Sequence, residues 1–243
     1  MAKKFTPAGS LISKKIGRAI GTYNMIEDGD TILVGISGGK DSLTLLDMLA
    51  ARQSFAPVRY AIHAVHIQPQ FNRDHDLESY LTDLFEKLGV PYTIDHMDIE
   101  VRSNKSNCFW CSWNRRKKMF DLAESLGFKK IALGHHKDDI IETTLLNMFF
   151  IGDFSTMNPV QEFFNGSLHI IRPLVYCEEK EIAAYAAERD FNDLESACQY
   201  KGNSKRQVIK DFIAMLEEKS PQVKTNIFKS MSRINQEYID LRE

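Results

Sequence analysis

The chain has 243 residues, a net charge of −2 and a pI of about 6.4, with 43% hydrophobic and 26% charged residues. This ordinary globular composition excludes disordered and collagen-like classes, and no apolar run approaches the roughly 18–20 residues of a membrane span. The near-neutral charge argues against a dedicated nucleic-acid binder, so any RNA contact must come from local basic clusters. The chain starts without a secretory signal pattern, and we expect a cytoplasmic protein with no membrane partner.

Predicted strands and helices alternate along the first 150 residues. Residues 10–27 have the apolar spacing of an amphipathic helix. Apolar runs at 31–36, 60–67, 91–97 and 130–134 predict strands, and they alternate with helices predicted at 41–53, 74–88, 112–126 and 139–150. This alternation with short connections predicts right-handed crossovers and a Rossmann-like parallel α/β sheet with helices on both faces.

The remaining residues predict a less regular segment followed by helices. A hairpin or loop is expected around Asn165-Gly166 within 151–175, and helices are expected at about 178–188, 204–219 and 221–242. We therefore expect an N-terminal helix at 1–27, an α/β domain at 28–175, and a C-terminal helical extension at 176–243 that packs on the same domain.

A glycine-rich loop, Ser37-Gly38-Gly39-Lys40-Asp41-Ser42, lies between the first predicted strand and the helix after it. The glycines let the backbone approach a ligand closely, and the helix N-terminus supplies N–H donors and a positive dipole end. The serine hydroxyls and Lys40 add donors and charge, which suits an oxyanion such as pyrophosphate. The loop does not have the Walker A or G-x-G-x-x-G pattern. An ordinary strand-to-helix turn is the simpler alternative, but a turn alone does not account for both serines, Lys40 and Asp41.

The loop from Ser37 to Ser42 resembles the PP-loop, SGGxDS, of the N-type ATP pyrophosphatases. The resemblance implies that ATP is cleaved between its α and β phosphates, that the substrate is adenylylated, and that pyrophosphate leaves. It also implies that 28–175 is a PP-loop domain and that a backbone stretch on the next strand holds adenine. That stretch corresponds to Ala64, Val65 and His66.

A second polar segment, Gly134-His135-His136-Lys137-Asp138-Asp139, follows the fourth predicted strand and opens a helix. Asp138 or Asp139 could simply cap that helix. The segment resembles GHHxDDxxET of tRNA-modifying PP-loop enzymes, and we expect it at the same sheet edge as the first loop. Gly134 and His135 are then candidate ATP contacts. We favour Asp139 as the catalytic carboxylate, with Asp138 as cap or second ligand, and either one as a Mg²⁺ ligand.

The four cysteines leave three readings open on spacing alone. Cys108 and Cys111 form a Cys-x-x-Cys pair, and Cys198 lies far downstream. They could be buried small residues, part of a zinc site that lacks a fourth ligand at suitable spacing, or three thiolate ligands of an iron–sulfur cluster. Cys177 lies in an apolar stretch, and we interpret it as a core residue.

The order of motifs is similar to that of the tRNA 2-thiocytidine synthetase (TtcA-type) family. It runs from Cys-x-x-Cys through the basic pair Arg115-Arg116, the histidine pair and Arg172-Pro173-Leu174 to Cys198 and Arg206-Gln207. The resemblance implies a 4Fe–4S cluster on Cys108, Cys111 and Cys198. The chain departs from the family at Lys201, where a second downstream cysteine is often found.

Three local basic clusters are candidates for RNA contacts. They contain Lys14, Lys15 and Arg18; Arg115, Arg116, Lys117 and Lys118; and Lys205, Arg206 and Lys210. A solvated charged face is the ordinary explanation of each. Because the second and third adjoin the cysteines, we predict that Arg116, Lys117, Lys205 and Arg206 contact the tRNA backbone.

The first hypothesis is therefore an ATP-dependent tRNA sulfurtransferase. ATP and Mg²⁺ bind at Ser37–Ser42, a base carbonyl oxygen attacks the α phosphate, and Lys40 stabilises pyrophosphate. Arg115, or alternatively Arg116, stabilises the adenylate, and sulfur from a cysteine desulfurase replaces the oxygen, forming 2-thiocytidine in the anticodon loop. A homodimer is one option for the assembly. A cysteine persulfide in place of the cluster is the second hypothesis, and a non-catalytic RNA-binding metal protein is the third.

Overall fold

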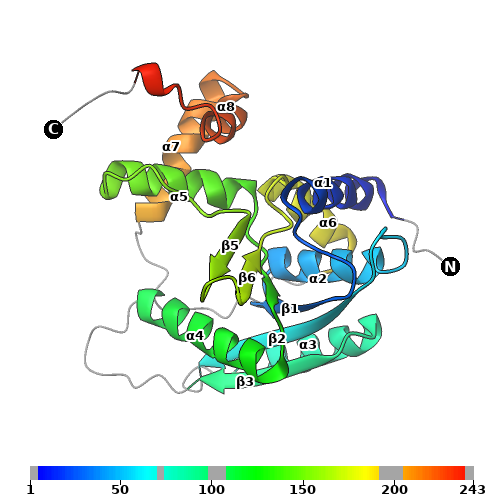
Figure 1. Ribbon diagram of the computed structural model, residues 1–243. Helices are drawn as coiled ribbons and strands as arrows, with labels where there is room; N and C mark the ends of the chain where they lie inside the picture. The colour runs from blue at the N-terminus through cyan, green and yellow to red at the C-terminus, as the bar shows by residue number, and fades with distance from the viewer. Residues whose placement is uncertain (1–4, 70–73, 98–107, 192–204, 239–243) are drawn as a thin grey trace. The chain divides into compact units, whose positions relative to one another are not determined.

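The structure is a computed structural model that describes residues 5–69, 74–97, 108–191 and 205–238. Its sheet has six strands in the order β3-β2-β1-β4-β6-β5 (Figure 1). Neighbouring strands are parallel except for β5, which pairs antiparallel with β6 at the sheet edge. The predicted α/β class is confirmed, with one antiparallel edge strand added. The strands are β1 Asp30–Ile36, β2 Tyr60–Pro69, β3 Tyr92–Met97, β4 Lys130–Ala132, β5 Val160–Phe163 and β6 Leu168–Ile171.

The chain forms two compact units, which are described separately. The sheet unit comprises Met1–His136 and Asn158–Lys201, and the helical unit comprises Lys137–Met157 and Gly202–Glu243. The helices of the sheet unit are α1 Pro7–Tyr23, α2 Lys40–Arg52, α3 His75–Leu88, α4 Cys108–Leu126 and α6 Glu179–Glu188. Those of the helical unit are α5 Lys137–Phe150, α7 Lys205–Lys219, α8 Val223–Ser230 and the 3₁₀ helix η2 Gln236–Tyr238. The boundaries of these packing units differ from the predicted domain boundaries after residues 27 and 175. The predicted organisation into three parts concerns folding domains and remains a prediction.

Alternating side chains of the central strands are buried on both faces of the sheet. Leu33 of β1 and Val65 of β2 belong to a core cluster that Met119 and Ala123 of α4 complete on one face. Ile32 is also fully buried, and because successive strand residues point to opposite faces it belongs to the other one. There α2 packs on β1 and against α1 and α6. Helices on both faces therefore leave the strand ends as the place for a ligand.

Several element ends differ from the predictions, and each has a local cause. Helix α1 begins at Pro7, earlier than predicted, because the Thr6 hydroxyl accepts from the Gly9 amide and caps it. Helix α4 begins at Cys108, four residues before the predicted start. The helix predicted at 221–242 is wrong in length, since α8 ends at Ser230. Ser230 and Ser232 donate hydrogen bonds to nearby carbonyls there, and such side-chain bonds compete with helix continuation.

The expected hairpin at Asn165-Gly166 is confirmed. β5 and β6 pair antiparallel around a turn in which Phe164, Asn165 and Gly166 all have positive φ angles, of 53°, 55° and 83°. The hairpin adds two strands to the four predicted ones and places the end of β6 beside that of β4. No helix among the described residues is long and apolar enough to cross a bilayer.

Candidate active site

The glycine-rich loop Ser37–Ser42 is held by hydrogen bonds within itself. The Ser42 hydroxyl donates to the Gly39 carbonyl oxygen at 2.9 Å and accepts from the Ser37 amide at 3.1 Å. The Ser37 hydroxyl lies 3.2 Å from that of Ser42 and accepts from the Gly39 amide at 3.2 Å. Gly38 has a φ angle of 92°, in the region that favours glycine. The serines were predicted as donors to a ligand, but here their first role is to shape the loop.

The segment after β4 lies directly against this loop. A Cβ atom added to Gly134 would come within 3.0 Å of the Ser42 amide nitrogen and 3.2 Å of the Asp41 carbonyl oxygen. These are backbone atoms, so the loop would have to shift by a few tenths of an ångström to admit any other residue at position 134. His136 Nε2 lies 3.9 Å from Asp41 Oδ1. Because β1 and β4 are parallel neighbours, both loops emerge at one edge, as expected for Gly134–His136.

Lys40 has a partner that the sequence did not reveal. Its Nζ lies 3.3 Å from Glu179 Oε1 and 3.5 Å from Asp41 Oδ1. Glu179 is the first residue of α6, where an acidic residue is usually explained by the helix dipole. The 139-residue separation of Lys40 and Glu179 explains why sequence reasoning missed the pair. A phosphate that binds Lys40 must therefore compete with Glu179.

His66 lies on β2, beside the end of β1. It pairs in the sheet with Ile36, the last residue before the loop, and its Nδ1 lies 2.9 Å from the Ile36 carbonyl oxygen. Since a carbonyl only accepts, Nδ1 carries the proton. Burial lowers the pKa of His66, and the charge of Arg115 on α4 lowers it further. The charge of Arg115 therefore reaches His66 at the β2 end of this edge. Ala64 is fully buried within the sheet, opposite Val34.

Arg172 lies at the end of β6 and belongs to the site. The sequence identifies it only as part of the Arg-Pro-Leu motif, without a role. It is 3% exposed, and its Nε donates to His135 Nδ1 at 3.3 Å. Burial, and then the charge of Arg116, lower the pKa of the guanidinium to about 10. Arg172 and His135 are 37 residues apart, so only the fold brings them together. The Arg-Pro-Leu motif was the one available sign that Arg172 matters.

Comparison with known proteins identifies the family. The PP-loop domain family matches residues 11–216. The chain belongs to the PP-loop family. Its curated relatives include tRNA-cytidine(32) 2-sulfurtransferases of Methylobacillus flagellatus, Ralstonia pickettii and Pseudomonas putida, at 43%, 42% and 41% identity. These alignments cover 95%, 92% and 90% of this chain and 77%, 72% and 81% of the relatives. The resemblance to the tRNA 2-thiocytidine family is thereby confirmed.

Solved structures of other proteins support the fold. The U34-tRNA thiolase NcsA from Methanococcus maripaludis, solved with its [4Fe-4S] cluster, superposes with a TM-score of 0.77. The superposition covers 96% of this chain and 80% of NcsA at 22% identity. NAD+ synthetase from Burkholderia pseudomallei has a TM-score of 0.51 at 13% identity and covers 98% of this chain and 93% of that one. At these identities the likeness shows a shared α/β fold.

The two aspartates of the second PP-loop motif lie in the helical unit, in the first turn of α5. Asp138 Oδ1 is 2.9 Å from Lys224 Nζ of α8, and Asp139 Oδ1 is 3.6 Å from Arg206 Nη2 of α7. Arg206 Nε also lies 3.1 Å from Glu142 Oε2. Arg206 thus has acidic partners within its own unit, and its predicted RNA contact requires it to leave them. Carboxylate oxygens suit Mg²⁺, so the donor chemistry fits the predicted ion if these pairs open.

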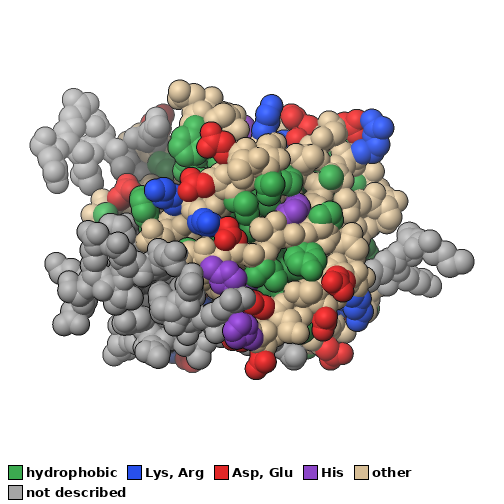
Figure 2. Space-filling model, turned by 90° about the horizontal axis from the view of Figure 1, so that it is seen from below, with side chains coloured by type: hydrophobic (Ala, Val, Ile, Leu, Met, Phe, Trp, Pro, Cys, Tyr) green, Lys and Arg blue, Asp and Glu red, His purple; other side chains and the backbone are tan. Residues whose placement is uncertain are grey.

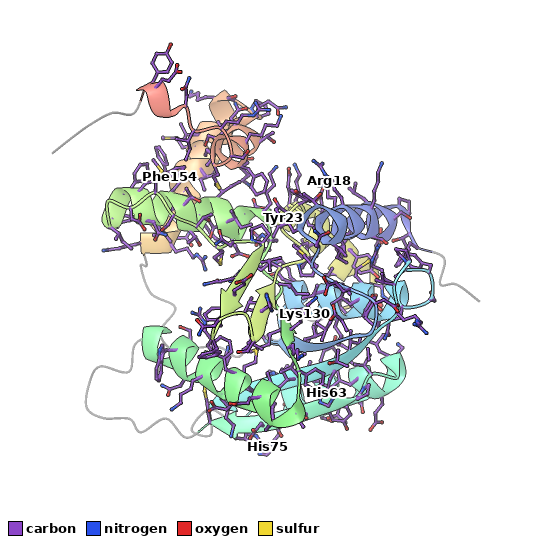
Figure 3. All side chains as sticks on the ribbon, in the orientation of Figure 1. Arg18, Tyr23, His63, His75, Lys130 and Phe154 are labelled. Carbon is purple, nitrogen blue, oxygen red and sulfur yellow. The ribbon has the colours of Figure 1, made fainter. Side chains whose placement is uncertain are left out.

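Other residues of the three candidate basic clusters also have neighbours in their own units. Lys15 Nζ lies 2.6 Å from Glu181 Oε1, and Arg18, labelled in Figure 3, stacks 4.7 Å from the Tyr176 ring centre. Lys117 lies 5.9 Å from the Trp113 ring centre, and Lys205 lies 4.9 Å from that of Phe150. Figure 2 shows one face on which basic side chains are interspersed with acidic and hydrophobic ones. The RNA-contact roles therefore remain predictions.

The cysteines divide into one buried residue and two at a helix start. Cys177 is fully buried, and burial raises its pKa to about 12, which confirms its interpretation as a core residue. Cys108 and Cys111 fall in the first turn of α4, a position where a helix favours thiolates. Positions 108, 111 and 115 share one helix face by their spacing. Cys198 lies outside the described residues, as does the departure at Lys201. The ligand chemistry fits an iron–sulfur cluster.

Proposed function

We propose that this protein is an ATP-dependent tRNA sulfurtransferase that forms 2-thiocytidine at position 32 of the anticodon loop. The observation that carries the proposal is the sheet edge where the Ser37–Ser42 loop meets Gly134, in a chain over 40% identical to tRNA-cytidine(32) 2-sulfurtransferases. Such an edge is where open α/β sheets bind nucleotides. An enzyme, rather than a passive RNA-binding protein, is what both observations support.

ATP binding and activation fall to the residues of this edge. The backbone of Ser37–Ser42 and the N-terminus of α2 bind the β and γ phosphates, and Lys40 exchanges Glu179 for the leaving pyrophosphate. His66, beside Ile36, lies where the adenine-binding stretch is predicted. The cytidine O2 attacks the α phosphate, the bond to pyrophosphate breaks, and the base becomes adenylylated. Asp139, with Asp138 as second ligand, is the proposed holder of Mg²⁺.

Sulfur transfer completes the proposed reaction. Cys108, Cys111 and Cys198 would hold a 4Fe–4S cluster, which would supply the sulfur that replaces the cytidine oxygen. A cysteine desulfurase would be the upstream donor, and a thiol reductant would bring its sulfur to the sulfide level. Arg115, which acts at the β2 end of the edge, stabilises the adenylate while AMP leaves from the C2 carbon. Trp113 is exposed and is available to stack on a base turned out of the loop.

Mass spectrometry of tRNA nucleosides from cells lacking the gene tests the substrate and reaction together. We expect loss of 2-thiocytidine, its return with the wild-type gene, and no return with Lys40→Ala. Unchanged 2-thiocytidine, or loss of a different thionucleoside instead, contradicts the proposal.

Iron and sulfide analysis after anaerobic purification tests the cluster. We expect Cys108→Ser and Cys198→Ser to lose iron, and the control Cys177→Ser to retain it because that thiol is buried in the core. A colourless, iron-free protein that still thiolates tRNA would eliminate the cluster and favour a cysteine persulfide.

A further inference from the structure

The end of β6 carries a buried cation with only neutral partners among the described residues. Arg172 is 3% exposed. It donates to the Asn158 carbonyl oxygen, to Gln161 Oε1 at 3.2 Å and to His135 Nδ1 at 3.3 Å. These hydrogen bonds give acceptors to the N–H groups of the guanidinium, but none of the acceptors carries a negative charge. A buried charge without a counter-ion is costly.

Lys130, another largely buried cation of this chain, has acidic partners that neutralise its charge. The Lys130 side chain, labelled in Figure 3, is 12% exposed, and its Nζ lies 2.6 Å from Asp30 and 3.7 Å from Glu27. No Asp or Glu in the described parts of the chain forms an ion pair with Arg172, and the charge of another cation, Arg116, adds to burial in lowering its pKa. Charge is therefore concentrated at Arg172 rather than neutralised.

This positive charge lies at the edge that holds the PP-loop. Ile171, just before Arg172, pairs with Ala132 of β4, and the chain continues from β4 to Gly134, which contacts the loop backbone. Arg172 also sets the state of His135. Because Arg172 Nε–H donates to Nδ1, that nitrogen is unprotonated, and the neutral ring carries its proton on Nε2. His135 thus becomes a hydrogen-bond donor at Nε2.

We propose that Arg172 and His135 form a phosphate-binding subsite beside the PP-loop, and that a bound phosphate supplies the missing counter-ion. The inference rests on the proposed function for the source of the phosphate, which is the α phosphate of ATP or a backbone phosphate of the tRNA. Both offer the anionic oxygens that a guanidinium and an imidazole N–H bind.

A nearly isosteric substitution tests this subsite without removing Arg172. Gln161→Glu places a carboxylate at the side-chain oxygen that already accepts from Arg172 at 3.2 Å, so it supplies an internal counter-ion. Asn165→Asp is the matched control, because it adds the same charge at the tip of the same hairpin, where Asp tolerates the positive φ. We expect Gln161→Glu, and not the control, to weaken phosphate binding about tenfold.

Two probes distinguish the source of the phosphate. The first is the ATP analogue with a methylene group between the α and β phosphorus atoms, and the second is an anticodon stem-loop RNA, each titrated against wild-type and variant protein. A weaker affinity for the analogue alone assigns the ATP phosphate, and a weaker affinity for the RNA alone assigns the tRNA backbone. Equal affinities of Gln161→Glu and Asn165→Asp for both probes overturn the subsite.

The stability of the ligand-free protein tests the charge argument independently of function. We expect Gln161→Glu to raise the Tm by about 2–4 °C, since it neutralises a buried cation, while Asn165→Asp leaves it unchanged. A lower Tm for Gln161→Glu would refute the uncompensated charge. If the wild type bound neither probe, the proposed function would fail, and the Tm comparison would still decide whether Arg172 lacks a counter-ion.

Discussion

The sheet unit and the helical unit hold their polar residues together in different ways. The loop Ser37–Ser42 is fixed by short hydroxyl and backbone hydrogen bonds and by the close approach of Gly134. Asp138, Asp139 and Glu142 of α5 are instead held by long cationic side chains of α7 and α8. Hydrogen bonds made by the backbone and short hydroxyl side chains preorganise a site, whereas ion pairs made by long, flexible side chains can open and re-form. The comparison suggests a rigid phosphate cradle and an adjustable set of carboxylates.

The largest expected effect concerns the two carboxylates. We expect Asp139→Asn to lower kcat for tRNA thiolation by about 10²–10³, because it removes a charge from the proposed metal site. Asp138→Asn should lower kcat less and stability more, since it removes the closer of the two acidic partners of Lys224 among the described residues, at 2.9 Å, and leaves only Glu217 at 3.0 Å. Single-turnover assays and urea unfolding measure the two quantities. The reverse order of activities would move the catalytic role to Asp138.

The rigidity of the cradle is tested at Gly134. We expect Gly134→Ala to weaken binding of the ATP analogue by about 10- to 100-fold and to cost about 1–3 kcal/mol of stability, since its Cβ would press on loop backbone at 3.0 Å. Gly21→Ala is the control, because nothing lies within 4 Å of its added Cβ in α1. Wild-type affinity in Gly134→Ala would show that the loop yields easily.

The ion pairs of the helical unit should respond to salt. Glu142 meets Arg206 at 3.1 Å and Lys210 at 3.7 Å, and both cations are partly exposed. We expect Glu142→Gln to lower the free energy of unfolding by about 1 kcal/mol at low salt and by less in about 1 M NaCl. The exposed Glu162→Gln in the sheet unit serves as control. A loss that is the same at both salt concentrations would argue against an electrostatic role.

The effect that is smallest at neutral pH is a pH dependence of stability from the sheet unit. Burial lowers the pKa values of His66 and His63 below 6.5. Below that pH the unfolded chain binds protons that the folded protein does not, so the free energy of unfolding falls as pH decreases below about 6.5. His66→Gln should flatten this slope, by at most about 1.4 kcal/mol per pH unit. Urea unfolding between pH 5 and 7.5 measures it, and an unchanged slope contradicts the assignment.

Local signals predicted much of this structure, and long-range contacts account for what they missed. Apolar runs located four of the six strands, and the predicted helix end at 88 matches that of α3, which Gly89 caps in the left-handed conformation. The first loop and Gly134 could be placed at one edge because parallel neighbouring strands end together. The pairs Lys40–Glu179 and Arg172–His135 could not be predicted, because they join side chains from distant helices, strands and loops. The end of α8 depended on serine side-chain bonds that periodicity does not register.

The sealed position of Cys177 has a practical consequence for anyone handling the protein. The chain has four cysteines, and this one is fully enclosed with a thiol that resists ionisation. Alkylating reagents attack thiolates, so the native protein can offer at most three quickly reacting sulfurs. Counting modified sulfurs by intact mass then tests how many of the three proposed cluster ligands are protected. The fourth sulfur, which reacts only after denaturation, serves as an internal standard for intact folding.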